Sequence, residues 1–206
     1  MISIRLAVLL AAAFLSQQLL ATENERQCID AAGDIKSRLE CIDGLKVEEL
    51  SSSAFPGMRQ FELRYLQPVD HERADGETFS QRLVLLHRSE NEPMVLQTSG
   101  YSIFGVRQAA ITSMFATNQL QVEHRFFSTS TPASRDWSKL NIKQSADDFH
   151  RITVALKQIY QKPWVNTGAS KGGMTSVYHR YFYPNDLDGT VADVAPLSFS
   201  TTDERY

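Results

Sequence analysis

The pattern of apolar and polar positions in the first part of the chain is that of β-strands. Apolar and charged residues alternate over 61–65, which is the period of a strand with one buried face, and a second strand is expected over 79–87. The short apolar run 94–98 leads into Ser99-Gly100-Tyr101, which predicts a buried strand that ends in a tight turn. A further strand is expected over 119–127.

The pattern then changes to a helical period. Between Asp136 and Tyr160 apolar residues recur at steps of three and four, which predicts an amphipathic helix. A strand over 164–167, a helix over 170–183 and a last strand over 190–195 follow. This order predicts the α/β class, with a mostly parallel sheet, right-handed crossovers and an antiparallel start formed by the first two strands.

Composition and charge narrow the possible partners. The chain has 206 residues and a formal net charge of -3, with basic residues scattered among acidic ones. Such a chain can bury a sizeable core and presents no basic stripe for phosphates, so we expect no nucleic-acid partner. We also expect no cofactor and no metal site, because His124 beside Glu123 lacks a second ligand at a suitable spacing.

Residues 1–21 have the composition of a signal peptide. One positive charge at Arg5 precedes an uncharged apolar run that ends at Leu15 and is too short to span a bilayer. Small residues suit the signal peptidase, so cleavage near Ala21 is expected, and residues 22–206 then form one domain. The mature protein is expected to be secreted or periplasmic, without membrane association. An uncleaved anchor is the alternative.

Export would also allow the two cysteines to form a disulfide. Cys28 and Cys41 both lie just after the expected cleavage point, where an oxidising compartment lets them pair. Such a small disulfide loop contributes roughly 2 to 3 kcal/mol of stability. Two free thiols are the alternative if residues 1–21 are not a signal peptide.

The strongest chemical signal is the segment Gly168-Ala169-Ser170-Lys171-Gly172-Gly173, between an expected strand and an expected helix. It matches the nucleophile elbow Gly-x-Ser-x-Gly, in which the serine sits on a strained turn and the glycines let strand and helix pass closely. Ser170 is therefore a candidate nucleophile. The backbone N–H groups of Lys171 and of the loop at Tyr101 are candidate oxyanion donors.

A glycine-rich turn without chemistry is an alternative interpretation of this segment. A phosphate-binding loop is another, and it fails because Lys171 precedes the last glycines instead of following them.

Several further segments resemble one family, the secreted bacterial tripeptidyl aminopeptidases that prefer proline before the cleaved bond. The resemblance covers essentially the whole mature chain, with its segments in the family's order and at similar spacings. The segments are Asp34–Leu39, Phe55-Pro56-Gly57, Gln67–His71, Val122–Phe127, Asp136–Leu140, Gly168–Thr175 and Tyr183–Asp186.

This resemblance implies an α/β-hydrolase core related to prolyl carboxypeptidases, a helical cap, and a triad in the order Ser, Asp, His. Ser170 matches the family's nucleophile, and Gly100-Tyr101 matches the loop that supplies an oxyanion donor. Glu123 lies in a matched segment where a carboxylate would hold the substrate's free amino group. A buried ion pair at the strand end is the alternative role for Glu123.

A triad also needs an imidazole within hydrogen-bond reach of the serine. After Ser170 the remaining histidine is His179, which lies about 13 Å further along the expected helix. We expect local structural roles for it and for His71, His87, His124 and His150. The chain is thus expected to be an inactive N-terminal part of the family's hydrolase domain, truncated after the strand that follows the nucleophile helix.

The resemblance implies that the parent protein is an exported serine aminopeptidase that releases short, proline-ending peptides through an acyl-enzyme. Its partner would be a peptide with a free amino terminus, and no oligomeric state is indicated. Two alternatives stay open: a non-catalytic peptide-binding remnant, and an esterase or lipase of the same fold.

Overall fold

The computed structural model describes residues 23–73 and 75–196, which belong to two compact units, one up to Asp43 and one from Gly44 onward. The two units are described separately. The expected signal peptide, residues 1–21, lies outside the described residues. None of the described helices is both long enough and apolar enough to cross a membrane.

The first unit is helical and carries the disulfide. Residues 23–31 are helical, and helix α2 (Ile35–Glu40) follows with Asp34 as its N-cap, whose carboxylate accepts a hydrogen bond from Lys36 N at 2.9 Å. Cys28 and Cys41 form the predicted disulfide, with their Cα atoms 5.7 Å apart. The cross-link ties the end of α2 to the preceding helix.

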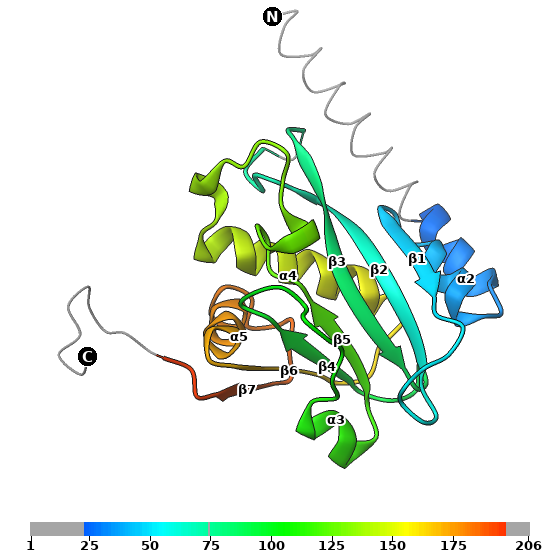
Figure 1. Ribbon diagram of the computed structural model, residues 1–206. Coiled ribbons are helices and arrows are strands. Elements are labelled where there is room, and N and C mark those ends of the chain that lie inside the picture. The colour runs from blue at the N-terminus through cyan, green and yellow to red at the C-terminus, as the bar shows by residue number, and fades with distance from the viewer. Residues whose placement is uncertain (1–22, 74, 197–206) are drawn as a thin grey trace, which may run out of the picture. The chain divides into compact units, whose positions relative to one another are not determined.

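The second unit is built on one seven-stranded sheet in the order β1-β2-β3-β5-β4-β6-β7 (Figure 1). Strands β1 to β3 and β5 pair antiparallel, whereas β5, β4, β6 and β7 pair parallel, as expected of an α/β fold with an antiparallel start. The strands are β1 (Leu45–Glu49), β2 (Arg59–Pro68), β3 (Thr78–His87), β4 (Met94–Thr98), β5 (Asn118–Val122), β6 (Trp164–Ala169) and β7 (Gly189–Asp193).

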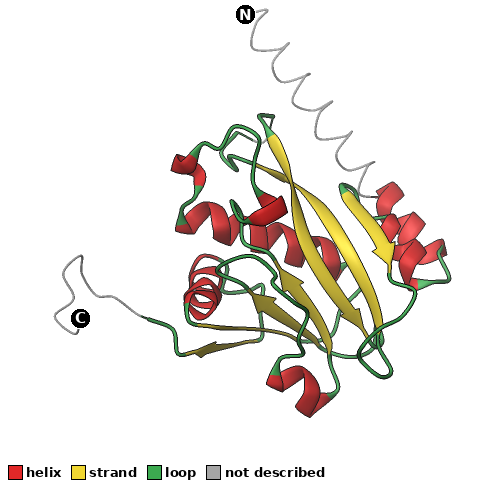
Figure 2. Ribbon diagram, in the orientation of Figure 1, coloured by secondary structure: helices red, strands yellow, loops and turns green. Residues whose placement is uncertain are grey.

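Three helices connect the parallel strands (Figure 2). Helix α3 (Ala110–Phe115) joins β4 to β5, α4 (Ile142–Lys157) joins β5 to β6, and α5 (Lys171–Phe182) joins β6 to β7. The step from β4 to β5 runs in the opposite direction along the sheet from the later two, so right-handed crossovers place α3 on one face and α4 and α5 on the other. Helices α4 and α5 pack against each other, and α5 packs on β6 and β7.

Helix α4 is shorter than the predicted span from Asp136 to Tyr160. Asn141 caps it by accepting a hydrogen bond from Gln144 N at 3.0 Å, and a separate 3₁₀ turn (Trp137–Lys139) precedes it. The cap starts a new helix, because its side chain satisfies an N–H group that a continuous helix would bond internally. The predicted apolar stripe is buried at Ala146, Phe149, Ile152 and Leu156.

One predicted boundary is corrected. Strand β5 ends at Val122, five residues before the predicted end at Phe127, and Phe126, with a φ of 66°, lies in the turn that follows the strand. The elements α2, β1 and α3 were not predicted. For β1 the signal was present, since Leu45 and Val47 alternate with charged residues, whereas a six-residue helix such as α3 is too short to show a period.

Candidate active site

Ser170 occupies a strained turn at the carboxyl end of β6. Its backbone angles are φ 55° and ψ -124°, outside the regions that side chains normally adopt, and it immediately precedes α5. The turn is held at both ends: Ser170 N donates to Asp193 O at 3.0 Å, and Met174 N donates to Ser170 O at 3.1 Å. The serine itself is exposed, so its hydroxyl lies above the sheet at the start of a helix.

The glycines on either side of Ser170 are needed for close approach. A Cβ atom at Gly168 would lie 2.5 Å from the backbone of Gly172, and one at Gly172 would lie 2.6 Å from Thr98 O. Strand β6, helix α5 and the end of β4 therefore meet at distances that no side chain permits. This is the steric arrangement that the motif predicts for an elbow.

The hydroxyl of Thr98, at the end of β4, forms hydrogen bonds with both β6 and α5. It is buried and lies 2.7 Å from Gly172 O, 2.7 Å from Ser176 Oγ and 3.2 Å from Thr167 O. One side chain at the end of β4 thus contacts both the strand before Ser170 and the first turns of the helix after it.

The candidate oxyanion donors have different environments. The N–H of Lys171 belongs to the first turn of α5, where N–H groups have no acceptor within the helix and the helix dipole favours negative charge. The N–H of Tyr101, in contrast, donates to Ser99 Oγ at 2.9 Å. The loop at Tyr101 is fixed by its carbonyl, which accepts from His124 N at 3.1 Å.

The side chain of Lys171 forms a clamp with two aromatic rings. Its ammonium nitrogen lies 4.9 Å from the ring centroid of Tyr101 and 4.6 Å from that of Phe127, and the two rings meet edge to face at 5.6 Å. Burial lowers the pKa of Lys171 below its ordinary value. The Lys171 clamp, defined by these three residues, connects the elbow to the loop after β4 and to the turn after β5.

Glu123 is fully buried at the end of β5 and is already bound inside the protein. Its carboxylate accepts from Ser130 Oγ at 2.7 Å, from Ile103 N at 3.1 Å and from Thr129 Oγ1 at 3.3 Å. Both oxygens therefore have internal donors, and none is directed to solvent. The geometry favours a structural role over the expected contact with a substrate's amino group, although the partners are mainly neutral donors rather than the ion pair considered from the sequence.

Arg125, in the turn after β5, forms a buried ion pair with Asp148 of α4. Arg125 Nε lies 2.7 Å from Asp148 Oδ2, Arg125 Nη2 lies 2.8 Å from Asp148 Oδ1, and His71 Nε2 approaches the same carboxylate at 2.7 Å. Burial acts to raise the pKa of Asp148, but the charge and hydrogen bonds of Arg125 and His71 outweigh it, so the pKa lies below its ordinary value. Because Arg125 Nη1 also donates to Val69 O and Lys139 O, the pair fixes the turn to the rest of the unit.

All five histidines of the chain have partners other than Ser170. His71 contacts Asp148, His87 contacts the Tyr160 hydroxyl, His124 contacts Ser145, and His150 and His179 share the carboxylate oxygen Oδ2 of Asp186. In residues 23–73 and 75–196 no imidazole is therefore poised to take a proton from Ser170. No group of His, Cys, Asp and Glu in the described part of the chain is arranged to hold a metal ion.

His124 lines a pocket together with Lys171, the residue after Ser170. It is 6% exposed, and burial lowers its pKa to about 4, so the imidazole is neutral at physiological pH. Its Nδ1 lies 2.9 Å from Arg125 O and its Nε2 lies 3.0 Å from Ser145 Oγ. A carbonyl can only accept, so Nδ1 carries the proton and Nε2 accepts from the serine hydroxyl.

The comparison with protein families identifies the chain's relatives. The sequence model of PS-10 peptidase S37 matches residues 29–205. The chain belongs to this peptidase family. The S37 chain is also 47% identical over 164 residues to the prolyl tri/tetrapeptidyl aminopeptidase of Streptomyces mobaraensis, a match that covers 79% of the chain and 34% of the relative. The predicted family resemblance is confirmed, and the chain spans about a third of that relative's length.

Solved structures confirm the predicted α/β-hydrolase core of the S37 chain. Acetyl xylan esterase 1 from Thermoanaerobacterium sp. JW/SL YS485 superposes with a TM-score of 0.54 at 10% identity, over 86% of the chain and 59% of the esterase. The acetyl xylan esterase from Paenibacillus sp. R4 gives 0.53 at 14% identity, over 86% and 58%. At such low identity the likeness concerns the fold alone.

The sequence did not indicate the partners of three side chains around the elbow of the S37 chain: the hydroxyl of Thr98, the imidazole of His124 and the ammonium of Lys171. Each is defined by partners from distant segments, which no local pattern reports. For His124 a signal existed, since Glu123-His124-Arg125 places three ionisable residues directly after an apolar strand.

Proposed function

We propose that the protein carrying this chain is an exported serine aminopeptidase with Ser170 as its nucleophile. One observation carries the proposal: in a chain of the S37 family, Ser170 lies on a backbone turn with φ 55° that only flanking glycines in close contact permit. Such a turn presents a serine hydroxyl at the N-terminus of a helix, where negative charge is stabilised.

The chemistry follows from this placement. A base takes the proton of Ser170 Oγ as the oxygen attacks the carbonyl carbon of a peptide bond, and negative charge develops on the carbonyl oxygen. The N–H of Lys171 donates to that oxygen, and the N–H of Tyr101 joins it when the Ser99 hydroxyl rotates away. The C–N bond breaks, the amine leaves with the proton, and water then hydrolyses the ester and restores the serine.

The base and its carboxylate partner are proposed to lie outside this chain. Every histidine of the chain is engaged elsewhere, and the relative is much longer than the segment it shares with the chain. The 206-residue chain alone is therefore proposed to be inactive. The relative's name supports peptides with a free amino terminus and proline before the cleaved bond as the substrate class.

Secretion or a periplasmic location is proposed for the same protein. The disulfide between Cys28 and Cys41 supports an oxidising compartment. The N-terminal sequence of protein recovered from outside the cytoplasm is expected to begin near Thr22, and a start at Met1 would contradict the signal peptide.

The test is hydrolysis of a chromogenic tripeptide that ends in proline. The complete gene product that carries this sequence is compared with its Ser170→Ala variant and with the 206-residue chain. We expect turnover by the complete protein alone, and loss of turnover when the substrate's amino group is acetylated. Equal turnover by the Ser170→Ala variant would refute the nucleophile, and turnover by the short chain would show that it holds a base.

A further inference from the structure

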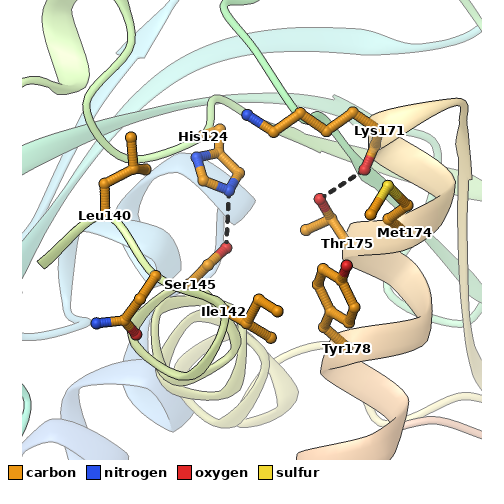
Figure 3. A pocket seen from close by; sticks show the side chains of 9 residues that line it. His124, Leu140, Ile142, Ser145, Lys171, Met174, Thr175 and Tyr178 are labelled. Carbon is orange, nitrogen blue, oxygen red and sulfur yellow. Dashed lines mark hydrogen bonds between the residues drawn. The ribbon is translucent and has the colours of Figure 1, made fainter. Parts of the chain in front are cut away.

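A pocket of about 220 Å³ lies between helices α4 and α5, close to the elbow (Figure 3). We call it the α4–α5 pocket. Its wall includes His124, Leu140, Ile142, Lys171, Met174 and Tyr178. Its volume is below the 300 to 1,000 Å³ that is typical of sites for whole small molecules, which suits a single side chain.

The pocket begins next to Ser170 and extends away from it. Lys171 follows the serine directly, and Met174 N donates to Ser170 O at 3.1 Å, so Met174 lies one helical turn further along α5. Tyr178 lies a second turn along, about 12 Å from the serine by helix rise. Consecutive Cα atoms lie about 3.8 Å apart, so the side chain of a residue that flanks the reacting one starts further from the serine than the proline ring does. Such a side chain is the better match for the far part of the pocket.

His124, Ser145 and Thr175 of the wall have internal hydrogen-bond partners, whereas the hydroxyl of Tyr178 lines the pocket. The neutral imidazole of His124 donates to Arg125 O and accepts from Ser145 Oγ, and Thr175 Oγ1 donates to Lys171 O at 2.9 Å. Figure 3 shows two of these hydrogen bonds as dashed lines, one between His124 and Ser145 and one between Thr175 and Lys171. The surface that remains for a ligand is mainly apolar, and it offers no carboxylate.

The charge at the rim is positive. Lys171 contributes an ammonium held by the rings of the Lys171 clamp, and its charge also acts to lower the pKa of His124. A cationic ligand group in the pocket would meet this charge without a compensating anion, which is unfavourable in a partly buried site.

We propose that the α4–α5 pocket is a specificity subsite that accepts one uncharged apolar side chain, of leucine or methionine size, from a residue flanking the one whose carbonyl reacts, and that Lys171 excludes lysine and arginine from it. The inference rests on the proposed function in one respect, since it takes the ligand to be a peptide. It adds a preference for an apolar side chain at a second position of the peptide, which the elbow does not specify.

The test measures binding rather than turnover. Calorimetry on the Ser170→Ala variant of the complete gene product gives the Kd of tetrapeptides based on Ala-Ala-Pro-Ala, in which each alanine in turn is replaced by leucine or lysine. At one position we expect leucine to bind about tenfold more tightly than alanine, because of its larger apolar area. Lysine at the same position should bind several-fold more weakly than alanine.

Two variants connect the preference to the pocket. Met174→Trp fills it and should make the leucine peptide bind no more tightly than the all-alanine peptide. Lys171→Met should raise the affinity of the lysine peptide to that of the alanine peptide. Val177→Trp is the matched control, because Val177 is half-buried on the same helix and is not part of the wall; thermal melting confirms that each variant is folded.

The outcomes separate the two proposals. Equal binding of leucine and alanine peptides at every position, or a leucine preference that survives Met174→Trp, would overturn the subsite even if Ser170-dependent hydrolysis is observed. A preference abolished by Met174→Trp in a protein without hydrolysis would support the subsite and refute the peptidase proposal.

Discussion

The side chain of Lys171 passes directly over Gly100: a Cβ atom at Gly100 would lie 2.5 Å from Lys171 Cγ and 2.6 Å from Lys171 Cβ. The residue after Ser170 and the loop after β4 are thereby held in contact through a position that has no side chain. The clamp with Tyr101 depends on this contact, because the lysine reaches the two rings across the glycine. The relationship connects the two segments proposed to supply the oxyanion donors.

Gly100→Ala is expected to disrupt this contact. The added methyl group must displace the lysine side chain or shift the loop, at a cost of about 1–3 kcal/mol in unfolding free energy, and peptide hydrolysis by the complete protein should fall by at least tenfold. Gly105→Ala is the control, since a Cβ there meets nothing within 4 Å. The unfolding midpoint in urea and kcat/KM measure the two effects, and equal behaviour of the two variants would contradict the prediction.

The hydroxyl of Thr98 is expected to stabilise the elbow. Thr98→Val keeps the shape of the side chain but removes hydrogen bonds to Gly172 O and Ser176 Oγ. Leaving these buried groups without a partner should lower the unfolding free energy by about 1–3 kcal/mol. Thr98→Ser retains the hydroxyl and should lose less. Denaturant titration distinguishes them, and a valine variant as stable as the wild type would show that the hydroxyl contributes nothing.

Removal of one charge from the buried pair of Arg125 and Asp148 should lower the unfolding free energy strongly. Asp148→Asn leaves the guanidinium at 0% exposure without its anion, and such breakage costs about 3–5 kcal/mol. Glu49→Gln breaks the pair with Arg59, whose side chains are 28% and 38% exposed, and should cost less than about 1 kcal/mol. Unfolding in urea compares the two variants. A loss for Asp148→Asn as small as that for Glu49→Gln would contradict the buried pair's importance.

Stability is expected to fall with acidity between pH 6.5 and about 4 because of His124. Burial in the folded protein holds the pKa of this histidine at about 4, below its ordinary value of 6.5, so the unfolded chain binds the proton first and stability rises with pH through this window. Titration of His124 changes the unfolding free energy by roughly 3 kcal/mol across this window. Urea unfolding at several pH values should show a shallower slope for His124→Gln, which does not titrate. Identical slopes would mean that the folded protein does not depress the histidine's pKa.

The features that could be predicted from the sequence are those that depend on neighbouring residues. Alternation and short apolar runs identified β2, β3, β4 and β6 to within a few residues, because a strand's burial pattern repeats every second position. The elbow was also readable, since the need for Gly168 and Gly172 arises within one turn of chain. The disulfide followed from having two cysteines in an expected export context.

The surroundings of Ser170, in contrast, emerge only from tertiary packing. The carboxylate of Glu123, a candidate for binding a substrate's amino group, is buried among internal donors, and the ammonium of Lys171 lies against two aromatic rings. The turn after β5 is likewise held by a residue from a distant segment, since Arg125 is paired with Asp148. These outcomes depend on burial and on partners from distant segments, so they arise when the chain packs and leave no local pattern to read.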